Sequence, residues 1–304
     1  MTAIYQANLI MTIKGSQLQE SVARHYDDDV TFNYEAIRLT EYAPIEFGLT
    51  KRYLNKIIPD RAIVADIGVG TGHYAELLAK RDCTLYLIDL SQRLLDATRA
   101  RLQKADCDRQ ARAFPCACRR RGVARQILAT YNISATNLAP LPPATCDAVL
   151  LLGPLYHLCS LEERQRAVAE ATRILKPNGI IFAAGINRLA YFREQFRSHC
   201  QQVLPRQNFH QQFLKSGNAD PVNIPPLGYA HLTTSEEFLQ LFAASFEQIK
   251  FIGVESFTAP FPTAGNNLSD SELEAWLDLV EATGTTTAGL GMSDHFLYIG
   301  HRKT

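Results

Sequence analysis

Short apolar runs alternate with amphipathic stretches along the middle of the chain. Apolar runs of about four to eight residues predict buried strands, because a strand of a parallel sheet is covered on both faces. Such runs lie at residues 62–67, 84–89, 127–129, 146–152 and 180–184. The stretches at 73–80, 94–102 and 161–175 carry apolar residues at helical spacing. Strands that alternate with helices predict a parallel sheet with helices on both faces.

The two ends of the chain add elements to this alternating core. Residues 16–56 have helical spacing, with aromatic residues between acidic ones, and predict an N-terminal helical segment. Residues 188–240 follow the fifth strand and predict a helical insertion with Pro-rich loops at 221–226. Two more apolar runs, 246–254 and 295–301, bring the predicted sheet to seven strands.

Composition and charge are those of an ordinary globular protein. The 304 residues include 31 basic and 31 acidic side chains, so charge gives no reason to expect nucleic acid or an anionic membrane as a partner. No run of about 18 apolar residues predicts a membrane span, and the N-terminus lacks the features of a secretory signal. The seven cysteines, without framework spacing, favour free thiols in a reducing compartment. We therefore expect a cytoplasmic protein.

A glycine-rich turn follows the first predicted strand and opens a helix. It reads Asp66-Ile67-Gly68-Val69-Gly70-Thr71-Gly72. Glycines suit a backbone that turns sharply and lies against a cofactor, and the amides at a helix start offer donors to a polar ligand. In the dinucleotide pattern the third glycine comes three residues after the second, whereas here the glycines are two residues apart. An acidic residue before the turn suits a cationic ligand such as a sulfonium amino acid.

A second acidic residue, Asp89, ends the next predicted strand. A carboxylate at that place can accept hydrogen bonds from both hydroxyls of a ribose. Alternatively, Asp89 caps the helix that begins after Leu90 and Ser91. The strand end and the preceding glycine turn favour the ribose interpretation.

Four segments together carry a family resemblance: Asp66–Gly72, Asp89, the strand Asp147–Leu152, and Leu175-Lys176-Pro177-Asn178-Gly179. They resemble class I methyltransferases that use S-adenosyl-methionine. The segment Leu152-Gly153-Pro154-Leu155-Tyr156-His157-Leu158, with its GPLYHL motif, is similar to one in a bacterial subgroup of small-molecule methyltransferases. Three more segments resemble that subgroup: His25-Tyr26-Asp27, Tyr229-Ala230-His231 and Ser293-Asp294-His295. The resemblance covers about residues 20–302.

The resemblance implies roles for residues at matching positions. Asp89 would hold the ribose of S-adenosyl-methionine. The loop from Gly153 to His157 would face the methyl group, because ligands of such sheets bind at the carboxyl ends of strands. The residues expected beside the methionine part are Asp66, Gly68, Gly70 and Gly72.

The chain departs from the family pattern where adenine would bind. The aspartate that many relatives place near the adenine falls on Ala135. Asn132, Thr136 or Asn137 could take its place beside the adenine; alternatively, only backbone groups contact the adenine. Of these we include Thr136 among the cofactor-binding residues.

Methyl transfer depends on alignment and exclusion of water, and it needs a base only when the acceptor must lose a proton. His157 would accept that proton or bond to the acceptor; alternatively, it orients the following helix. Tyr26 would close over the cofactor, or it is a core aromatic of its helix. Tyr156 would line the acceptor pocket; alternatively, it only packs in the core. His231 and His295 are expected in the same pocket from the resemblance alone.

Two other clusters are less specific. Cys107, Cys116 and Cys118 lack the paired C-x-x-C spacing of a four-ligand metal site, so no metal is expected. Residues 99–125 hold nine basic residues against two aspartates. Phe114 is the one aromatic there that could stack on a base, which favours a solvated helix and loop over a nucleic-acid surface.

The sequence therefore predicts a Rossmann-like α/β fold. Its seven-strand, mostly parallel sheet would have helices on both faces, an N-terminal helical lid and a helical cap insertion. The expected boundaries are a lid at 1–56, a cofactor-binding core at 57–187, a cap at 188–240, and completion of the sheet by 241–304.

The predicted function is transfer of a methyl group from S-adenosyl-methionine to a small-molecule acceptor, with neither nucleic acid nor membrane as a partner and with acceptor atom and oligomeric state open. Ala135 keeps a non-catalytic cofactor-binding protein of the same fold as an alternative. The glycine spacing disfavours a nicotinamide-dependent oxidoreductase. The neutral charge and the missing Asn-Pro-Pro-Tyr motif disfavour a methyltransferase acting on nucleic acid.

Overall fold

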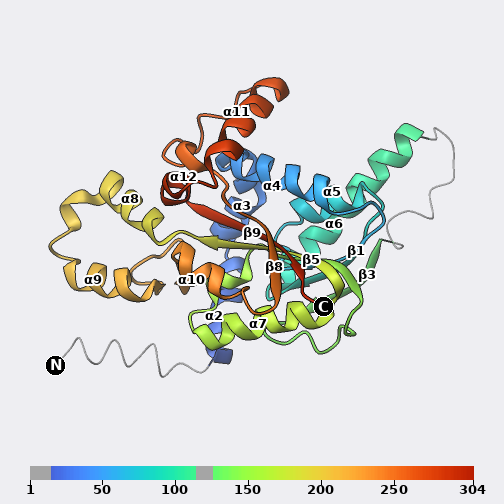
Figure 1. Cartoon of the computed structure of the whole chain (residues 1–304), viewed down its shortest axis with the longest axis horizontal. Coiled ribbons are helices and arrows are strands. Elements are labelled where there is room, and N and C mark those ends of the chain that lie inside the picture. The colour runs from blue at the N-terminus through green and yellow to red at the C-terminus, as the bar shows by residue number, and fades with distance from the viewer. Residues whose placement is uncertain (1–14, 114–125) are drawn as a thin grey trace.

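A seven-stranded sheet forms the centre of the molecule (Figure 1). The computed structural model describes residues 15–113 and 126–304. The strands are β1 (Ile63–Ile67), β2 (Thr84–Asp89), β3 (Ile127–Asn132), β4 (Cys146–Leu151), β5 (Leu175–Ile186), β8 (Phe246–Gly253) and β9 (His295–Arg302). Their order is β3-β2-β1-β4-β5-β9-β8; the pairs from β3 to β5 are parallel, and β9 runs antiparallel to both of its neighbours, β5 and β8. The predicted seven-strand, mostly parallel sheet is confirmed.

The strand order reverses at β1, which pairs with β2 on one side and β4 on the other. In register, Asp66 of β1 lies between Leu87 and Leu150. The carboxyl ends of these three strands therefore meet at one edge. Open α/β sheets bind their ligands at such a switch point, so this edge is where a site is expected.

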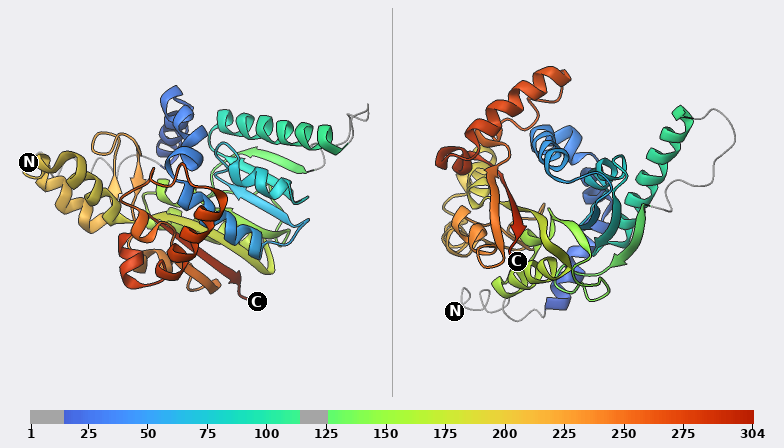
Figure 2. Two further views of the ribbon diagram at one scale, coloured as in Figure 1. Left: turned by 90° about the horizontal axis from the view of Figure 1, so that it is seen from above. Right: turned by 45° about the vertical axis from the view of Figure 1, so that its right-hand side comes forward.

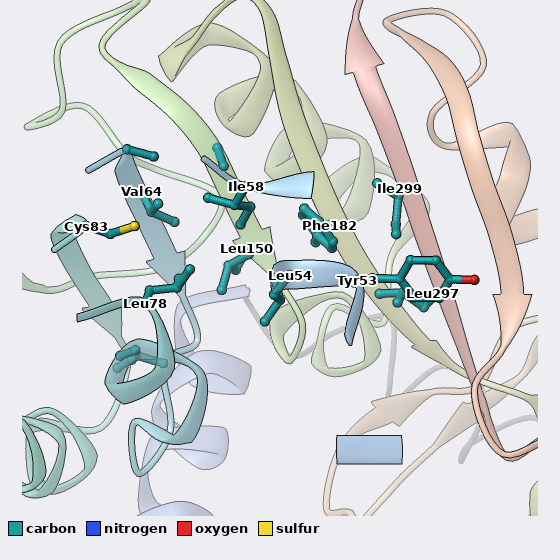
Figure 3. Close-up of a cluster of buried hydrophobic side chains, with 14 of the residues drawn as sticks. Tyr53, Leu54, Ile58, Val64, Leu78, Cys83, Leu150, Phe182, Leu297 and Ile299 are labelled. Carbon is teal, nitrogen blue, oxygen red and sulfur yellow. The ribbon is translucent and has the colours of Figure 1, made fainter. Parts of the chain in front are cut away.

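Alternate residues of each strand pack against helices on opposite faces, as the period of two in a strand requires. On one face Val64, Leu150 and Phe182 pack with Leu54 and Leu78 (Figure 3). The helices that contribute to this core are α4 (Pro44–Ile57), α5 (His73–Ala79), α6 (Gln92–Ala113) and α11 (Asp270–Thr283). The other core takes residues from α7 (Leu161–Ile174) and the region of α10 (Ser235–Gln240). Helices thus cover both faces, as predicted.

The N-terminal segment is helical and lies over the end of β1. It comprises α2 (Gly15–Asp27), α3 (Asp29–Ile37) and a π-helical turn, η1 (Arg38–Tyr42), that leads into α4. None of the residues of α3 is fully buried, and polar contacts help to hold this helix in place. The Thr71 hydroxyl donates to the carbonyl of Glu35 at 3.4 Å, and His73 Nε2 donates to that of Ala36 at 3.0 Å. These bonds tie α3 to the start of α5.

The insertion after β5 has a small core of its own. It contains α8 (Arg188–His199), η4 (Cys200–Gln202), α9 (Gln207–Ser216) and the antiparallel pair β6 (Asn218–Ala219) and β7 (Ala230–His231). Tyr191 and Phe213 pack with buried aliphatic residues of the insertion. Figures 1 and 2 show α8 and α9 extending away from one end of the sheet. After α11, the chain forms α12 (Thr287–Met292) before β9.

Three details differ from, or add to, the sequence analysis. Helix α7 ends at Ile174, within one residue of its predicted end, but β5 begins at once at Leu175 rather than at Ile180. Helix α6 continues to Ala113, into a stretch that the pattern did not resolve. Phe114, Cys116, Cys118 and the basic residues among 114–125 lie outside the described residues.

Two findings bear on the cysteines and on membranes. Cys83, Cys146, Cys159 and Cys200 are free, and the first three are buried. None of the helices described over 15–113 and 126–304 combines the length and the apolar character that crossing a membrane requires.

Candidate active site

The glycine turn joins β1 to α5 at the switch point of the sheet. Gly68, Gly70 and Gly72 all have positive φ, at 74°, 58° and 81°. A Cβ at Gly72 would lie 2.7 Å from Thr98, so glycine is needed there for packing. A Cβ at Gly70 would meet nothing within 4 Å. The backbone at Gly70 is therefore bare toward open space, as a loop that receives a ligand must be.

That open space is a cavity between the glycine turn, the loop after β4 and the lid helices α2 and α3. Seven of the residues expected in the site line it: Tyr26, Gly68, Gly70, Asp89, Gly153, Tyr156 and His157. Five others do not: Asp66, Gly72, Thr136, His231 and His295. The structure thus brings together residues from the lid, β1, β2 and the loop after β4.

Asp89 has bonds on both carboxylate oxygens and still faces the cavity. Its Oδ2 accepts from the amide of Gly70 at 3.0 Å, and its Oδ1 from the amide of Ser91 at 2.9 Å. The cap of α6 is Ser91, whose hydroxyl accepts from the amide of Leu94 at 3.0 Å. Burial raises the pKa of Asp89 to about 6, against the effect of the amide bonds. Since Ser91 caps the helix, Asp89 is left to support the glycine turn and to meet a ligand.

Asp66 lies behind the turn rather than in the cavity. It is buried, and burial together with the nearby Asp89 raises its pKa to about 7. This pair of buried carboxylates favours a cationic ligand, because Asp89 disfavours the ionised form of Asp66 unless a positive charge approaches.

The end of the cavity beyond Asp89 is lined by Ile133, Ser134 and Ala135. Thr136 turns back and shares a hydrogen bond of 2.9 Å with the Ser134 hydroxyl. Asn132 is also engaged, since its amide donates to the carbonyls of Asp89 and Leu90. The expected substitute, Thr136, is therefore one residue away from the lining, and Ser134 is the polar side chain that sequence reasoning missed.

Tyr26 and His157 meet across the cavity. The Tyr26 hydroxyl lies 2.6 Å from His157 Nε2, and His157 Nδ1 lies 3.0 Å from the carbonyl of Tyr229. A carbonyl only accepts, so Nδ1 carries the proton and Nε2 accepts from the tyrosine. Burial lowers the pKa of His157 to about 4 and raises that of Tyr26 well above its ordinary value. Both side chains are therefore neutral near pH 7.

Glu35 also lines the cavity, and sequence reasoning missed it. It lies on α3, with Arg38 Nε at 3.6 Å from its carboxylate. Burial raises its pKa, and Arg38 opposes this shift. The one sequence signal was the mixture of acidic and aromatic residues in the N-terminal helices.

His231 does not join the cavity. Its Nδ1 lies 2.8 Å from Asn218 Oδ1, which links β7 to β6 within the cap. Burial, with Arg164 and Arg188 nearby, lowers its pKa to about 3. The expectation that His231 reaches the acceptor pocket is not met, because its ring is committed to the cap.

His295 lies in a neighbouring pocket with Arg38, Glu46 and Glu255. Its Nδ1 is 2.5 Å from Glu255 and 3.6 Å from Glu46. Burial lowers its pKa, but these two carboxylates outweigh that effect and raise it to about 9. The expectation that His295 lines the acceptor pocket is not met either, since His295 belongs to an ion-pair network outside the cavity.

That network has the spacing of a metal site, yet it is already neutralised. The ligand atoms of Glu46, Glu255 and His295 lie within 4.8 Å of one another. Arg38 bonds both oxygens of Glu46, at 2.8 and 3.3 Å, and the protonated His295 faces Glu255. Two cations thus balance two carboxylates without a metal ion.

Comparison with known proteins identifies the central part of the chain. The methyltransferase domain family matches residues 65–183, which include the glycine turn, Asp89 and His157. This segment is a class I methyltransferase domain. It uses S-adenosyl-methionine.

The methyltransferase domain has similar folds among solved structures. The [4+2]-cyclase SpnF is 18% identical with a TM-score of 0.56, and the match covers 94% of this chain and 97% of that one. The 1,6-didemethyltoxoflavin-N1-methyltransferase of Burkholderia thailandensis, bound to S-adenosylhomocysteine, is 15% identical with a TM-score of 0.51, over 94% and 88% of the two chains. These likenesses show the Rossmann-like fold.

A curated relative corrects one expectation. The tRNA (carboxymethyluridine(34)-5-O)-methyltransferase ALKBH8 of Macaca fascicularis is 26% identical over 166 residues, which cover 55% of this chain and 20% of that protein. The chain thus spans about a fifth of the length of this relative. The exclusion of nucleic acid as a partner was wrong: net charge averages over the whole surface and does not describe the site.

S-adenosyl-methionine fits the cavity on three observations. Gly70 is bare toward it, and Asp89 faces it. Among the described residues that line it, none is Lys or Arg. A sulfonium ligand therefore meets carboxylates and aromatic rings and no competing cation.

Proposed function

We propose that the chain transfers the methyl group of S-adenosyl-methionine to a small-molecule acceptor bound beneath the lid formed by α2 and α3. The observation that carries this proposal is the cavity itself, in which a bare Gly70 and Asp89 face Tyr26 and Glu35 of the lid. The lid helices, the glycine turn and the loop after β4 border that cavity on several sides, which suits a compact acceptor. When bound, the cofactor supplies a methyl group already activated by its sulfonium.

In this proposal the chain's own residues hold and align the reactants. Asp89 accepts from the ribose hydroxyls through the lone pairs that the Gly70 and Ser91 amides leave free. The bare backbone at Gly68 and Gly70 receives the methionine part, with Asp66 behind it. Ser134 and the backbone at Ala135 border the adenine, and Gly153 lies beside the methyl group. The lid excludes water, and such positioning accounts for most of the rate of methyl transfer.

The finer assignment is to the bacterial small-molecule subgroup with a GPLYHL segment. In this chain that segment forms η3 (Pro154–His157), which presents Tyr156 and His157 to the cavity. The contact of His157 with Tyr26 joins this segment to the N-terminal tyrosine helix that the same subgroup shares. The two marks of the subgroup thus act as one unit here, which supports the proposal.

A second candidate is a nucleoside within tRNA, favoured by the relative that acts on carboxymethyluridine. In that case the small acceptor beneath the lid is one nucleobase substituent rather than a free molecule. A non-catalytic cofactor-binding protein of the same fold is the third possibility, because Ala135 stands where many relatives place an aspartate near the adenine.

Two experiments separate these candidates. Calorimetry with S-adenosyl-homocysteine and with NAD tests the cofactor, and binding of NAD alone would refute the proposal. Transfer of radiolabelled methyl is then compared between a metabolite extract and purified total tRNA. Label in the small-molecule fraction supports our proposal, label in tRNA supports the second candidate, and tight cofactor binding without transfer to either supports the third.

A further inference from the structure

The acceptor side of the cavity contains one carboxylate that no cofactor contact requires. Glu35 lies on α3, whose backbone is anchored at two points. The Glu35 carbonyl accepts a hydrogen bond from Thr71 of the glycine turn, and the Ala36 carbonyl accepts one from His73 at the start of α5. Its side chain lines the cavity together with Tyr26 and Tyr156. The anchored backbone fixes the position of the carboxylate in this cavity, near the place that the proposed function gives to the methyl group.

Glu35 is only loosely held by its neighbours. Arg38 gives its two terminal nitrogens to Glu46, at 2.8 and 3.3 Å. Only its Nε approaches Glu35, at 3.6 Å, which is an ion pair and too long for a hydrogen bond. Burial raises the pKa of Glu35, so the carboxylate is a better proton acceptor than an ordinary glutamate. Tyr26 and Tyr156 face it, and Glu46 and His25 lie nearby.

The other titratable groups of the described lining already have partners or stay neutral. Both nitrogens of His157 have partners, with Tyr26 and the Tyr229 carbonyl. Both oxygens of Asp89 accept backbone amides. Burial raises the pKa values of Tyr26 and Tyr156, so neither phenol ionises near pH 7. Among the described lining residues, Glu35 is therefore the group best placed to take a proton.

The acidic lining of the cavity favours an acceptor with a positive charge. Glu35 and Asp89 are the charged residues of the described lining, and both are acidic. An acidic acceptor would meet repulsion and find no cation to pair with, because Arg38 is held by Glu46. An ammonium group would pair with Glu35 and lie against the tyrosine rings.

We propose that the acceptor is an amine and that Glu35 takes its proton, an inference that rests on the proposed methyl transfer. The ammonium form of the acceptor pairs with Glu35 and gives the carboxylate one proton. The freed nitrogen lone pair then forms a bond to the methyl carbon as the carbon–sulfur bond breaks, with its electron pair left on sulfur. The products are a methylated ammonium, a neutral thioether and protonated Glu35, which returns its proton to water when the lid opens.

The test compares ligands that differ only in the reacting group. Matched sets of primary amine, alcohol and carboxylic acid on the same scaffolds, for example tyramine, tyrosol and 4-hydroxyphenylacetate, are added to the complex with S-adenosyl-homocysteine. Binding is measured by thermal shift and calorimetry. We expect amines to bind at least about tenfold more tightly than their partners, because a charge-assisted pair is at stake. If the amines bind no more tightly than the matching alcohols and acids, the inference is wrong.

Two variants place that preference on Glu35. In Glu35→Gln the amine preference should disappear, and any amine turnover should fall by about 10² to 10⁴, the scale of acid–base help. Binding of S-adenosyl-homocysteine should stay as in the parent. Glu41→Gln, an exposed change on the next helical turn, should alter neither. A preference that survives in Glu35→Gln overturns the role of Glu35.

The cofactor measurement separates the two proposals. If S-adenosyl-homocysteine fails to bind the parent chain, the proposed function itself fails. If it binds the parent and Glu35→Gln loses that binding as well, Glu35 serves the ammonium of the cofactor, and the inference about the acceptor is wrong.

Discussion

The Tyr26 hydroxyl donates a 2.6 Å hydrogen bond to Nε2 of His157, across 131 residues of sequence. This bond joins the lid helix α2 to the loop after β4, directly above the glycine turn. Because Nδ1 of His157 donates to the Tyr229 carbonyl, the imidazole is locked in one tautomer. We therefore propose that His157 positions Tyr26 and that the lid closes through this bond.

Tyr26→Phe and His157→Ala should slow methyl transfer by similar factors, about three- to tenfold, since each removes one hydrogen bond. The double variant should be no slower than either, because the two residues act as one unit. His157→Asn, which can still accept from Tyr26, should stay near the parent rate. Steady-state kinetics measure all four. If His157 is instead the general base, His157→Asn loses about 10² to 10⁴ in rate, as His157→Ala does.

Asp89→Ala should weaken binding of S-adenosyl-homocysteine strongly. Two charge-assisted hydrogen bonds are lost, each worth about 1.5–3 kcal/mol. Calorimetry measures the dissociation constant, and circular dichroism checks that the fold survives. Asp96→Ala, an exposed change in the same helix–strand region, is the matched control and should bind as the parent does. An unchanged constant in Asp89→Ala would limit this residue to supporting the Gly70 and Ser91 amides.

Gly70→Val should abolish cofactor binding. The branched side chain would occupy the space that is open now, and it opposes a φ of 58°. Gly291→Val is the comparison, because a Cβ there also meets nothing within 4 Å but no cavity of the active site lies beside it. A folded Gly70→Val that binds S-adenosyl-homocysteine as tightly as the parent would contradict the placement of the ligand.

Because of the ion pairs of His295, the free energy of unfolding should fall as the solution becomes alkaline. The pKa of His295 is raised in the folded chain to about 9, against an unfolded value of about 6.5. A group whose pKa is raised by folding stabilises the folded state in full at pH values below its unfolded pKa. For His295 that stabilisation is lost as the pH rises from about 6.5 to about 9. The shift corresponds to on the order of 3 kcal/mol.

Urea unfolding between pH 6 and 10 measures this loss. His295→Gln should flatten the decline, whereas His301→Gln, at an exposed histidine of the same strand, should leave it as in the parent. The same decline in both variants would assign the pH dependence to other groups, such as Asp66.

Much of the fold follows from local pattern. The apolar runs of β1, β2 and β4 and the helical spacing of α7 are properties of neighbouring residues, because periods of 2 and 3.6 are set by backbone geometry. The glycine turn is equally local, since positive φ at Gly70 needs the absence of a Cβ at that residue alone. Hence the order of elements along the chain and the cofactor class could be read from sequence, whereas the switch point at β1 came from the structure.

The partners of individual side chains could not be read in this way. His231 and His295 look alike in sequence as histidines next to strands, yet one bonds Asn218 in the cap and the other pairs with Glu255. Glu35 has no motif around it, and its place in the cavity depends on how α3 packs on the start of α5.

The sequence by itself thus determined the sheet, the cofactor turn and the seven residues that line the cavity as expected. Only the tertiary structure decided that Tyr26 meets His157, that Thr136 turns away and that Glu35 faces the acceptor side. The physical reason is range. Strands, turns and caps are fixed by contacts within a few residues, whereas ionisation and proton transfer depend on burial and on charges that distant segments bring together.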